Sequence, residues 1–299
     1  MPVKLDRMLS AVQNGQWSVD DFDWSTPLQG AEGLSPRART EAAYSLLFTA
    51  GLERQAAAIF DLAAEFADDE QARQIYKLFA KDERRHAEAE TRLAARYGVA
   101  PEDLPLPIRW SLKTLAKNFR APNRGLHELS SAIIVLFELA LDTMLLPALK
   151  EQVDDPLQSK VFRLIDLDET RHLAMDYWLL DQKAKLYDGR TFREVVEAES
   201  GPKSLLDRAT GRYKMIRSMV ALLVAFGSTS LLMPNMRKAI DEQKLAKYLA
   251  RVDDIPRKAR GALSVPTFRM GMKGQRLIVD LVMRLDGRAR STSRLARAQ

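Results

Sequence analysis

The sequence contains no cysteine among its 299 residues. Disulfide frameworks, cysteine-ligated zinc, thiol nucleophiles and iron–sulfur clusters are therefore excluded as chemistry for this chain. Histidine is almost as scarce, with three copies, so a metal site must draw mainly on carboxylates. Glycine and proline are also sparse, which excludes collagen-like and low-complexity sequence. The apolar fraction of 46% is sufficient for a buried core, and we expect one large domain or one domain with extensions.

Long apolar runs are missing as well. No uncharged apolar run reaches the roughly 18 residues that a membrane-spanning helix needs, and residues 1–7 lack the apolar core of a signal peptide. These absences predict a cytoplasmic protein. The uncharged stretch 219–233 has 15 residues, with Arg217 just before it and Pro234 just after it. We predict that it forms a helix buried against the rest of the protein; the alternative is a helix at a membrane interface or along an acyl-chain pocket.

Negative charge is scarce at the carboxyl end of the chain. Residues 257–299 contain 11 Lys and Arg against two Asp, so this segment carries more than the whole net charge of +6. We expect residues 286–299 to be a flexible basic tail that could contact anionic lipid, at the periphery of a membrane, or an acidic carrier protein. No aromatic residues are interleaved with these arginines, so we predict no nucleic-acid partner.

Alternating apolar and polar residues are absent, so the pattern predicts helices and few or no strands. Residues 1–35 are rich in aromatic, acidic and turn residues and are expected to form an irregular arm. Ser35-Pro36 is a typical helix start, and Gly98 is a typical helix end. The predicted helices are 36–66, 68–98, 109–119, 126–152, 156–187, 205–226, 235–251 and 269–285. Residues 36–187 form two long helical hairpins in this interpretation, and residues 188–285 form a carboxyl-terminal helical extension packed on them.

One five-residue motif, Asp-Glu-x-Arg-His, occurs twice, at 82–86 and at 168–172. Each copy follows a single glutamate on the preceding helix: Glu53 lies 30 residues before Glu83, and Glu138 lies 31 residues before Glu169. Residues three apart share one face of a helix, so the Glu and the His of each motif point the same way. The hairpin geometry then places both single glutamates level with their motifs, to within roughly 3 Å along the helix axis.

The two hairpins therefore bring four carboxylates and two imidazoles together inside the protein. These six candidate metal ligands are Glu53, Glu83, His86, Glu138, Glu169 and His172. Four buried carboxylates without compensation are very costly, whereas two divalent cations neutralise them. An oxygen-rich set with two histidines suits iron or manganese better than structural zinc.

This pattern resembles the ferritin-like di-iron carboxylate superfamily over residues 36–187. The resemblance implies an all-α protein, a ferritin-like four-helix bundle with an N-terminal arm and additional C-terminal helices. It also implies that Glu53 and His86 bind one metal, that Glu138 and His172 bind the other, and that Glu83 and Glu169 bridge them. The neighbouring residues that would orient the histidine ligands are Asp82, Arg85, Asp168 and Arg171.

The resemblance further implies an O₂-activating non-haem di-iron oxidoreductase: a hydroxylase, a desaturase or a related oxygenase. Its cofactors would be two Fe ions, or Fe with Mn, with O₂ as co-substrate. Its partners would be a hydrophobic small-molecule substrate, which the apolar stretch 219–233 suggests is an acyl chain, an electron-donating reductase or ferredoxin, and a second copy in a homodimer. Certain N-oxygenases carry an additional His where this chain has Ile165, which disfavours that branch.

Two other functions remain open. One is a ferritin- or rubrerythrin-like protein that handles iron or peroxide, although the absence of cysteine excludes the cysteine-ligated iron domain of rubrerythrins. The other is a non-enzymatic helical scaffold that is stabilised by metal.

Five further polar residues lie near the motifs in the sequence. We interpret His127 as a residue of a helix start or of the surface, and Glu90 as a solvated residue. Asp142 fits two roles equally well, a partner of the metal ligands or a partner of a cation elsewhere. Tyr76 and Tyr177 are interpreted as packing residues rather than as radical sites.

Overall fold

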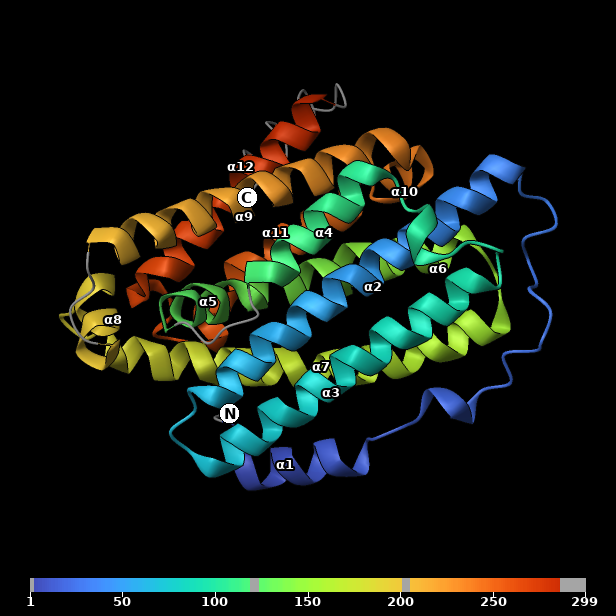
Figure 1. Cartoon of the computed structure of the whole chain (residues 1–299). Helices are drawn as coiled ribbons and strands as arrows, with labels where there is room; N and C mark the ends of the chain where they lie inside the picture. Colours follow the sequence, from blue (N-terminus) through green and yellow to red (C-terminus); the bar gives the residue numbers. More distant parts are fainter. Residues whose placement is uncertain (1–2, 119–123, 201–204, 286–299) are drawn as a thin grey trace.

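The computed structural model describes residues 3–118, 124–200 and 205–285. These residues fold into helices and short helical turns, and no strand is present among them (Figure 1). The elements, in chain order, are α1 (Leu5–Asn14), η1 (Val19–Asp21), α2 (Pro36–Glu65), α3 (Glu70–Ala95), η2 (Pro101–Asp103), α4 (Leu106–Asn118), α5 (Arg124–Ala140), η3 (Leu141–Leu145), α6 (Leu146–Gln152), α7 (Pro156–Leu186), α8 (Phe192–Ser200), α9 (Leu205–Leu232), α10 (Pro234–Ala239), α11 (Glu242–Lys258), η4 (Ala262–Ser264) and α12 (Pro266–Leu285).

The long helices begin at residues that cap them. The Ser35 hydroxyl accepts a hydrogen bond from the Ala38 amide at the start of α2, and Asp155 caps α7 through the Gln158 amide. In both helices a proline follows the cap, where its missing N–H costs nothing. The cap of α3 is Asp69, one residue later than the helix start expected at position 68.

The predicted helix 126–152 is interrupted by one wide turn. It begins as α5, passes through a π-helical turn at Leu141–Leu145 (η3) and continues as α6. Pro147 lies just after this turn; it lacks an N–H, and its ring would collide with the carbonyl four residues earlier in a regular α-helix. A widened turn removes this conflict without ending the helix.

The segment Arg124–Gln152 is long and apolar enough, by length and composition, to cross a membrane. We expected no segment of this kind, because that expectation considered only runs without any charged residue, and this segment contains charged residues. Of its most apolar window, 67% is buried inside the protein, and the segment carries the buried Glu138. A core helix has these properties, because its apolar side chains pack against its own neighbours.

The amino-terminal arm is more ordered than predicted. Residues 5–14 form helix α1, which packs on α3 and α7, and η1 follows it. Asp20 and Asp21, in η1, belong to a capped turn in which the Ser18 side chain accepts from a backbone amide. The expectation of an irregular arm was therefore wrong for residues 5–14, whose apolar positions recur at helical spacing and pack onto the helices below.

The carboxyl-terminal helices cover one side of this core. Helix α9 packs along α4, and α12 packs along α5. The expected helix 235–251 is two helices, because Asp241 caps a new one by accepting from the Lys244 amide. The predicted burial of residues 219–233 holds for one side of α9 only; several large apolar side chains on its other side are exposed. The predicted basic tail, 286–299, lies outside the described residues.

Candidate metal centre

Six acidic and histidine side chains from four helices meet in the interior. Each is at most 3% exposed. They are Glu53 from α2, Glu83 and His86 from α3, Glu138 from α5, and Glu169 and His172 from α7. The structure therefore brings together all six residues that the repeated motif indicated.

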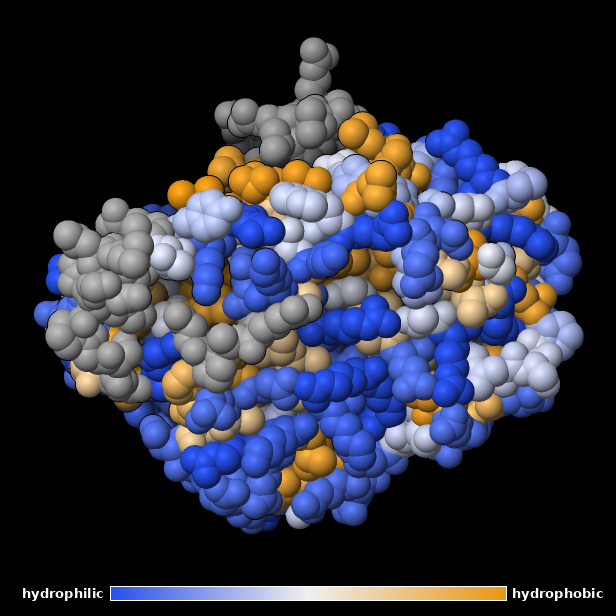
Figure 2. Space-filling model, in the orientation of Figure 1, coloured by the Kyte–Doolittle hydropathy of each residue, from blue (hydrophilic) through white to orange (hydrophobic). Residues whose placement is uncertain are grey.

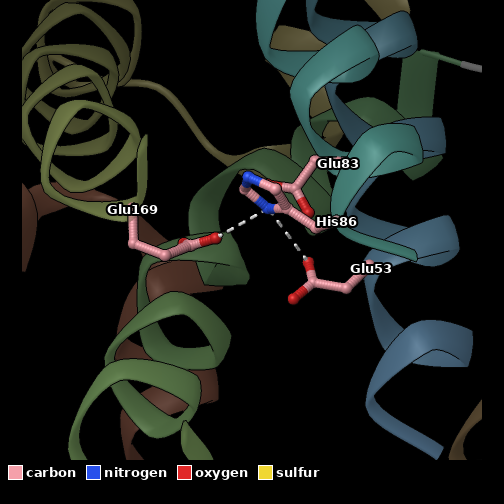
Figure 3. Close-up of side chains that lie close together, drawn as sticks. All are labelled: Glu53, Glu83, His86 and Glu169. Carbon is pink, nitrogen blue, oxygen red and sulfur yellow. Dashed lines mark ion pairs between the residues drawn. The ribbon is translucent and has the colours of Figure 1, made fainter. Parts of the chain in front are cut away.

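The six residues form two groups that share two members. One group is Glu53, Glu83, His86 and Glu169, and the other is Glu83, Glu138, Glu169 and His172. Within each group, one potential ligand atom from every residue lies within 4.8 Å of those of the others. Figure 3 shows the first group, with Glu53 and Glu169 facing His86 from different helices. The two carboxylates common to both groups are the two that the resemblance assigned as bridges.

The Nδ1 atom of each imidazole faces the carboxylates. His86 Nδ1 lies 3.3 Å from Glu169 Oε1 and 4.0 Å from Glu53 Oε2. His172 Nδ1 lies 2.8 Å from Glu83 Oε1 and 3.7 Å from Glu169 Oε2. These contacts are close, but the Nδ1 atoms have no partner in hydrogen-bond geometry. The inner nitrogens are therefore available as ligand atoms.

The Nε2 atoms face outward, and each meets the aspartate of the opposite motif. His86 Nε2 lies 2.9 Å from Asp168 Oδ2, and His172 Nε2 lies 3.6 Å from Asp82 Oδ2. A carboxylate on Nε2 holds the proton there and leaves Nδ1 as a lone-pair donor. Asp168 thus orients His86 across α3 and α7 through a hydrogen bond, whereas Asp82 faces the Nε2 atom of His172 from beyond hydrogen-bond distance.

Two arginines hold these aspartates. Arg85 Nη2 donates to Asp82 Oδ1 at 2.7 Å and to Asp168 Oδ2 at 2.9 Å, so one guanidinium joins both motifs. Arg171 donates to the other oxygen of Asp168. Burial raises the pKa of Asp168, but its bonds to His86, Trp17 and Arg85 outweigh this and hold the pKa at about 2. The carboxylate is therefore ionised throughout the physiological range.

The arm contributes two residues that the sequence did not single out. Trp17 Nε1 donates to Asp168 Oδ2 at 2.9 Å, and the indole is stacked on His86 with ring centroids 6.1 Å apart. Gln16 donates through Nε2 to Asp82 Oδ1 at 2.8 Å, and its Oε1 accepts from Arg85 at 2.9 Å. The arm therefore closes the layer of hydrogen bonds around the imidazoles. The only signal for this in the sequence was the aromatic content of residues 1–35.

The pKa shifts in the cluster show that its negative charges are not balanced by the protein's own cations. Burial and the neighbouring Glu83 raise the pKa of Glu53, and burial and Glu169 raise the pKa of Glu138. Burial by itself would lower the pKa of His86, but the hydrogen bond to Asp168 and the nearby Glu169 carboxylate raise it to about 10. Without a cation the cluster retains protons in order to balance its carboxylates.

Unpartnered atoms point to the same conclusion. Both oxygens of Glu83 and of Glu169 are buried without a hydrogen-bond partner, and so is one oxygen each of Glu53 and Glu138. Buried polar atoms are rarely left in this condition, because each costs about 1–3 kcal/mol. Two divalent cations coordinated by these oxygens and by the Nδ1 atoms would satisfy all of them at once.

The repeat extends one helical turn beyond each histidine. Glu90 follows His86 by four residues, and Asp176 follows His172 by four residues. Both carboxyls are buried, and their oxygens have no hydrogen-bond partner. Burial raises the pKa of Glu90 to about 8 and that of Asp176 well above its ordinary value. The interpretation of Glu90 as solvated was wrong, because its face of α3 is the face that carries the ligands.

The remaining candidates lie elsewhere. His127 is at the start of α5, as expected, but it is only 4% exposed, with its ring 5.1 Å from that of Phe66. Asp142 pairs with Arg251 of α11, which decides between its two predicted roles. His127 and Asp142 belong to neither four-residue group.

Both tyrosines pack against side chains outside the two groups. Tyr76 packs against Phe60 and Phe79. The ring centroids of these two phenylalanines lie 5.3 and 4.1 Å from that of His172. Tyr177 lies under the ammonium of Lys258.

No protein-family model matches this sequence, and no curated protein matches it. The all-helical fold and the buried carboxylate and histidine groups are therefore established by the structure of this chain alone.

Proposed function

We propose that this chain is a di-metal oxidoreductase that activates O₂ on a ferritin-like four-helix bundle formed by α2, α3, α5–α6 and α7. The observation that carries the proposal is the pair of four-residue groups that share Glu83 and Glu169. Two carboxylates common to two adjacent sites are the arrangement expected of bridging ligands, and a single-metal site has no use for them.

The donor set favours iron, with manganese as an alternative at one or both positions. Six carboxylate and imidazole residues offer hard and intermediate ligands, and thiolates are absent from the whole chain. Two reduced iron ions held by these residues would supply two electrons to O₂, and the reductase or ferredoxin would restore them. Cofactors and co-substrate in this proposal are two Fe ions and O₂.

The protein's own contribution is to orient the ligands, to hold protons and to exclude water. Asp168 fixes the tautomer of His86, Asp82 faces the Nε2 atom of His172, and Arg85 holds both aspartates. Phe60 and Phe79 pack on His172, and Trp17 covers His86, so apolar rings exclude water from both ends of the cluster. Glu90 and Asp176 hold protons in the same interior, one turn from the ligands.

The substrate in this proposal is a hydrophobic organic molecule such as an acyl chain, and a reductase or ferredoxin supplies the electrons. The interior that surrounds the ligands is apolar, which suits a substrate that carries few polar groups. The carboxyl-terminal helices α8–α12 lie outside the four-helix bundle, and their residues can form a substrate site beside it.

The experiment is a metal assay joined to an oxygen reaction. The protein is purified from iron-supplemented cells, its iron is counted, and its absorption spectrum is followed after anaerobic reduction and exposure to O₂. We expect about two irons per chain and a transient absorbing species. Glu83→Ala and His172→Ala should lose both, whereas Glu88→Ala, an exposed residue of the same helix, should lose neither.

The alternatives give other outcomes. Turnover of Fe²⁺ or peroxide that accounts for all the O₂-dependent signal, with no oxidation of organic compounds, would assign the chain to iron or peroxide handling. Absence of iron, or zinc content that Glu83→Ala and His172→Ala leave unchanged, would contradict the di-metal site itself and leave a helical scaffold.

A further inference from the structure

Helix α9 is apolar on two opposite sides. On its inner side Ala221, Ala225 and Thr229 are buried against the protein. On its outer side six large apolar side chains are between 44% and 78% exposed. These six form what we call the α9 stripe: Tyr213, Ile216, Met219, Val220, Leu223 and Leu231.

The stripe follows the helix axis in a straight line. Tyr213, Ile216, Val220 and Leu223 are spaced by three, four and three residues, which keeps them on one face. Figure 2 shows hydrophobic side chains gathered along the upper part of the view, where α9 runs in Figure 1. Single exposed leucines are ordinary on protein surfaces, but a continuous row of this length marks a surface that binds something apolar.

The surroundings of the stripe are basic. Between Asp207 and Asp241 the sequence has no acidic residue and six Lys and Arg. Lys214 is exposed on α9, and Arg269 and Lys273 are exposed on α12, whose carboxyl-terminal part reaches the top of Figure 1. Helix α12 also carries the exposed apolar side chains Met270 and Leu277.

Charge is divided between the two parts of the chain. Residues 205–299 contain 20 Lys and Arg against seven acidic residues, whereas residues 1–204 contain 26 against 33. The part of the chain that carries the apolar stripe is therefore strongly positive, and the part that carries all four helices with the candidate metal ligands is negative. A protein charged in this way is oriented by an anionic surface before it makes any contact.

We propose that the α9 stripe, with the exposed face of α12, docks this protein onto an anionic lipid bilayer. The apolar row enters the boundary between headgroups and acyl chains, and exposed lysines and arginines of α9 and α12 contact lipid phosphates. The positive charge of this part of the chain favours an anionic bilayer over a second copy of the chain as the binding partner. A two-fold contact through α9 would bring two strongly positive surfaces together, whereas an anionic bilayer turns the same charge into attraction.

The test is vesicle flotation with the full-length protein. Vesicles of phosphatidylcholine alone are compared with vesicles that also contain phosphatidylglycerol, at low and high salt. We expect binding to the anionic vesicles that weakens as salt is raised. Leu223→Ser should weaken it by roughly fivefold because it removes a half-exposed leucine from the stripe. Lys214→Gln should also weaken it by about fivefold.

Matched controls separate docking from general effects of the substitutions. Leu167 on α7 is 53% exposed against 55% for Leu223, so Leu167→Ser removes the same side chain from another surface and should leave binding unchanged. Lys77→Gln on α3 is the corresponding control for charge.

Three results would overturn the proposal. They are absence of vesicle binding, binding that Leu167→Ser weakens as much as Leu223→Ser, and a homodimer that binds no vesicles and that Leu223→Ser dissociates. Light scattering of each variant, against the 33.8 kDa of one chain, identifies the last case.

Discussion

The outer nitrogen of His86, Nε2, donates a hydrogen bond to Asp168 Oδ2 at 2.9 Å, although the two residues belong to different copies of the repeated motif. In the second copy Asp82 faces the outer nitrogen of His172 at 3.6 Å, which is beyond hydrogen-bond distance. Each motif therefore carries a candidate metal ligand on its own helix and places its aspartate beside the histidine of the other motif. This arrangement requires α3 and α7 to be in register, and a shift of either helix by one turn would remove it.

Asp168→Asn tests this crosswise arrangement. The amide cannot hold the proton on His86 Nε2 as a carboxylate does, so we expect affinity for Mn²⁺ or Fe²⁺ to fall by roughly 10–100-fold. Calorimetric titration measures the affinity. Asp166→Asn is the control, because Asp166 lies on the same helix and pairs with Lys150 at the surface. Equal affinities for the two variants would show that Asp168 plays no part in metal binding.

Trp17→Phe tests the contribution of the arm. Phenylalanine retains a ring against His86 but cannot donate to Asp168, so we expect metal affinity to fall several-fold and stability by about 1 kcal/mol. Trp24→Phe removes a comparable bond, to the Val19 carbonyl, away from the cluster. This control should lose similar stability and no affinity. If both variants bind metal like the wild type, the arm only packs on the bundle.

The buried carboxylate of Glu138 should destabilise the protein in the absence of metal. Burial and Glu169 raise the pKa of Glu138, so its stabilising contribution is intact in acid and is lost as pH rises above its unfolded value of about 4.3. Glu138→Gln should therefore increase the stability of the chelator-treated protein at pH 7.5, by about 1–3 kcal/mol, and decrease metal affinity.

Urea unfolding with and without metal measures both effects of this substitution. Glu88→Gln, at an exposed position, should change neither by more than about 0.5 kcal/mol. A Glu138→Gln protein that is less stable than the wild type in chelator would mean that Glu138 serves the fold rather than a metal.

The six candidate ligands could be grouped from the sequence because their spacing has a cause within single helices. Glu83 and His86 share a face of one helix whatever surrounds it, and the hairpins determine which glutamates are level with them. The pairing of Asp82 with His172 has no such local cause, because it depends on how α3 and α7 pack. The contact of Trp17 with the cluster could not be predicted for a similar reason, because no periodic pattern connects the arm to the helices that it covers.

Two other differences had signals that composition obscured. Glu90 lies in a run of charged residues, which favours exposure, yet its position four residues after His86 places it on the ligand face. Asp176 holds the matching position after His172, so the internal repeat itself contained the correct prediction. Pro147 likewise indicated an irregular turn within the helix that begins at Arg124.

His127 gives a test that is independent of metal. Burial, with Lys183 and Arg124 nearby, lowers its pKa to about 2, from 6.5 in the unfolded chain. The folded protein therefore keeps this imidazole neutral, and its contribution is intact above pH 6.5 and is lost as pH falls below that value. When the pH is lowered from 7.5 to 5.0, the free energy of unfolding of the wild type should fall by about 2 kcal/mol more than that of His127→Gln. Urea unfolding of metal-free protein at both pH values measures the difference. Titration of the acidic cluster is common to the two proteins and cancels, so parallel pH dependences would mean that His127 is solvated and charged in the folded state.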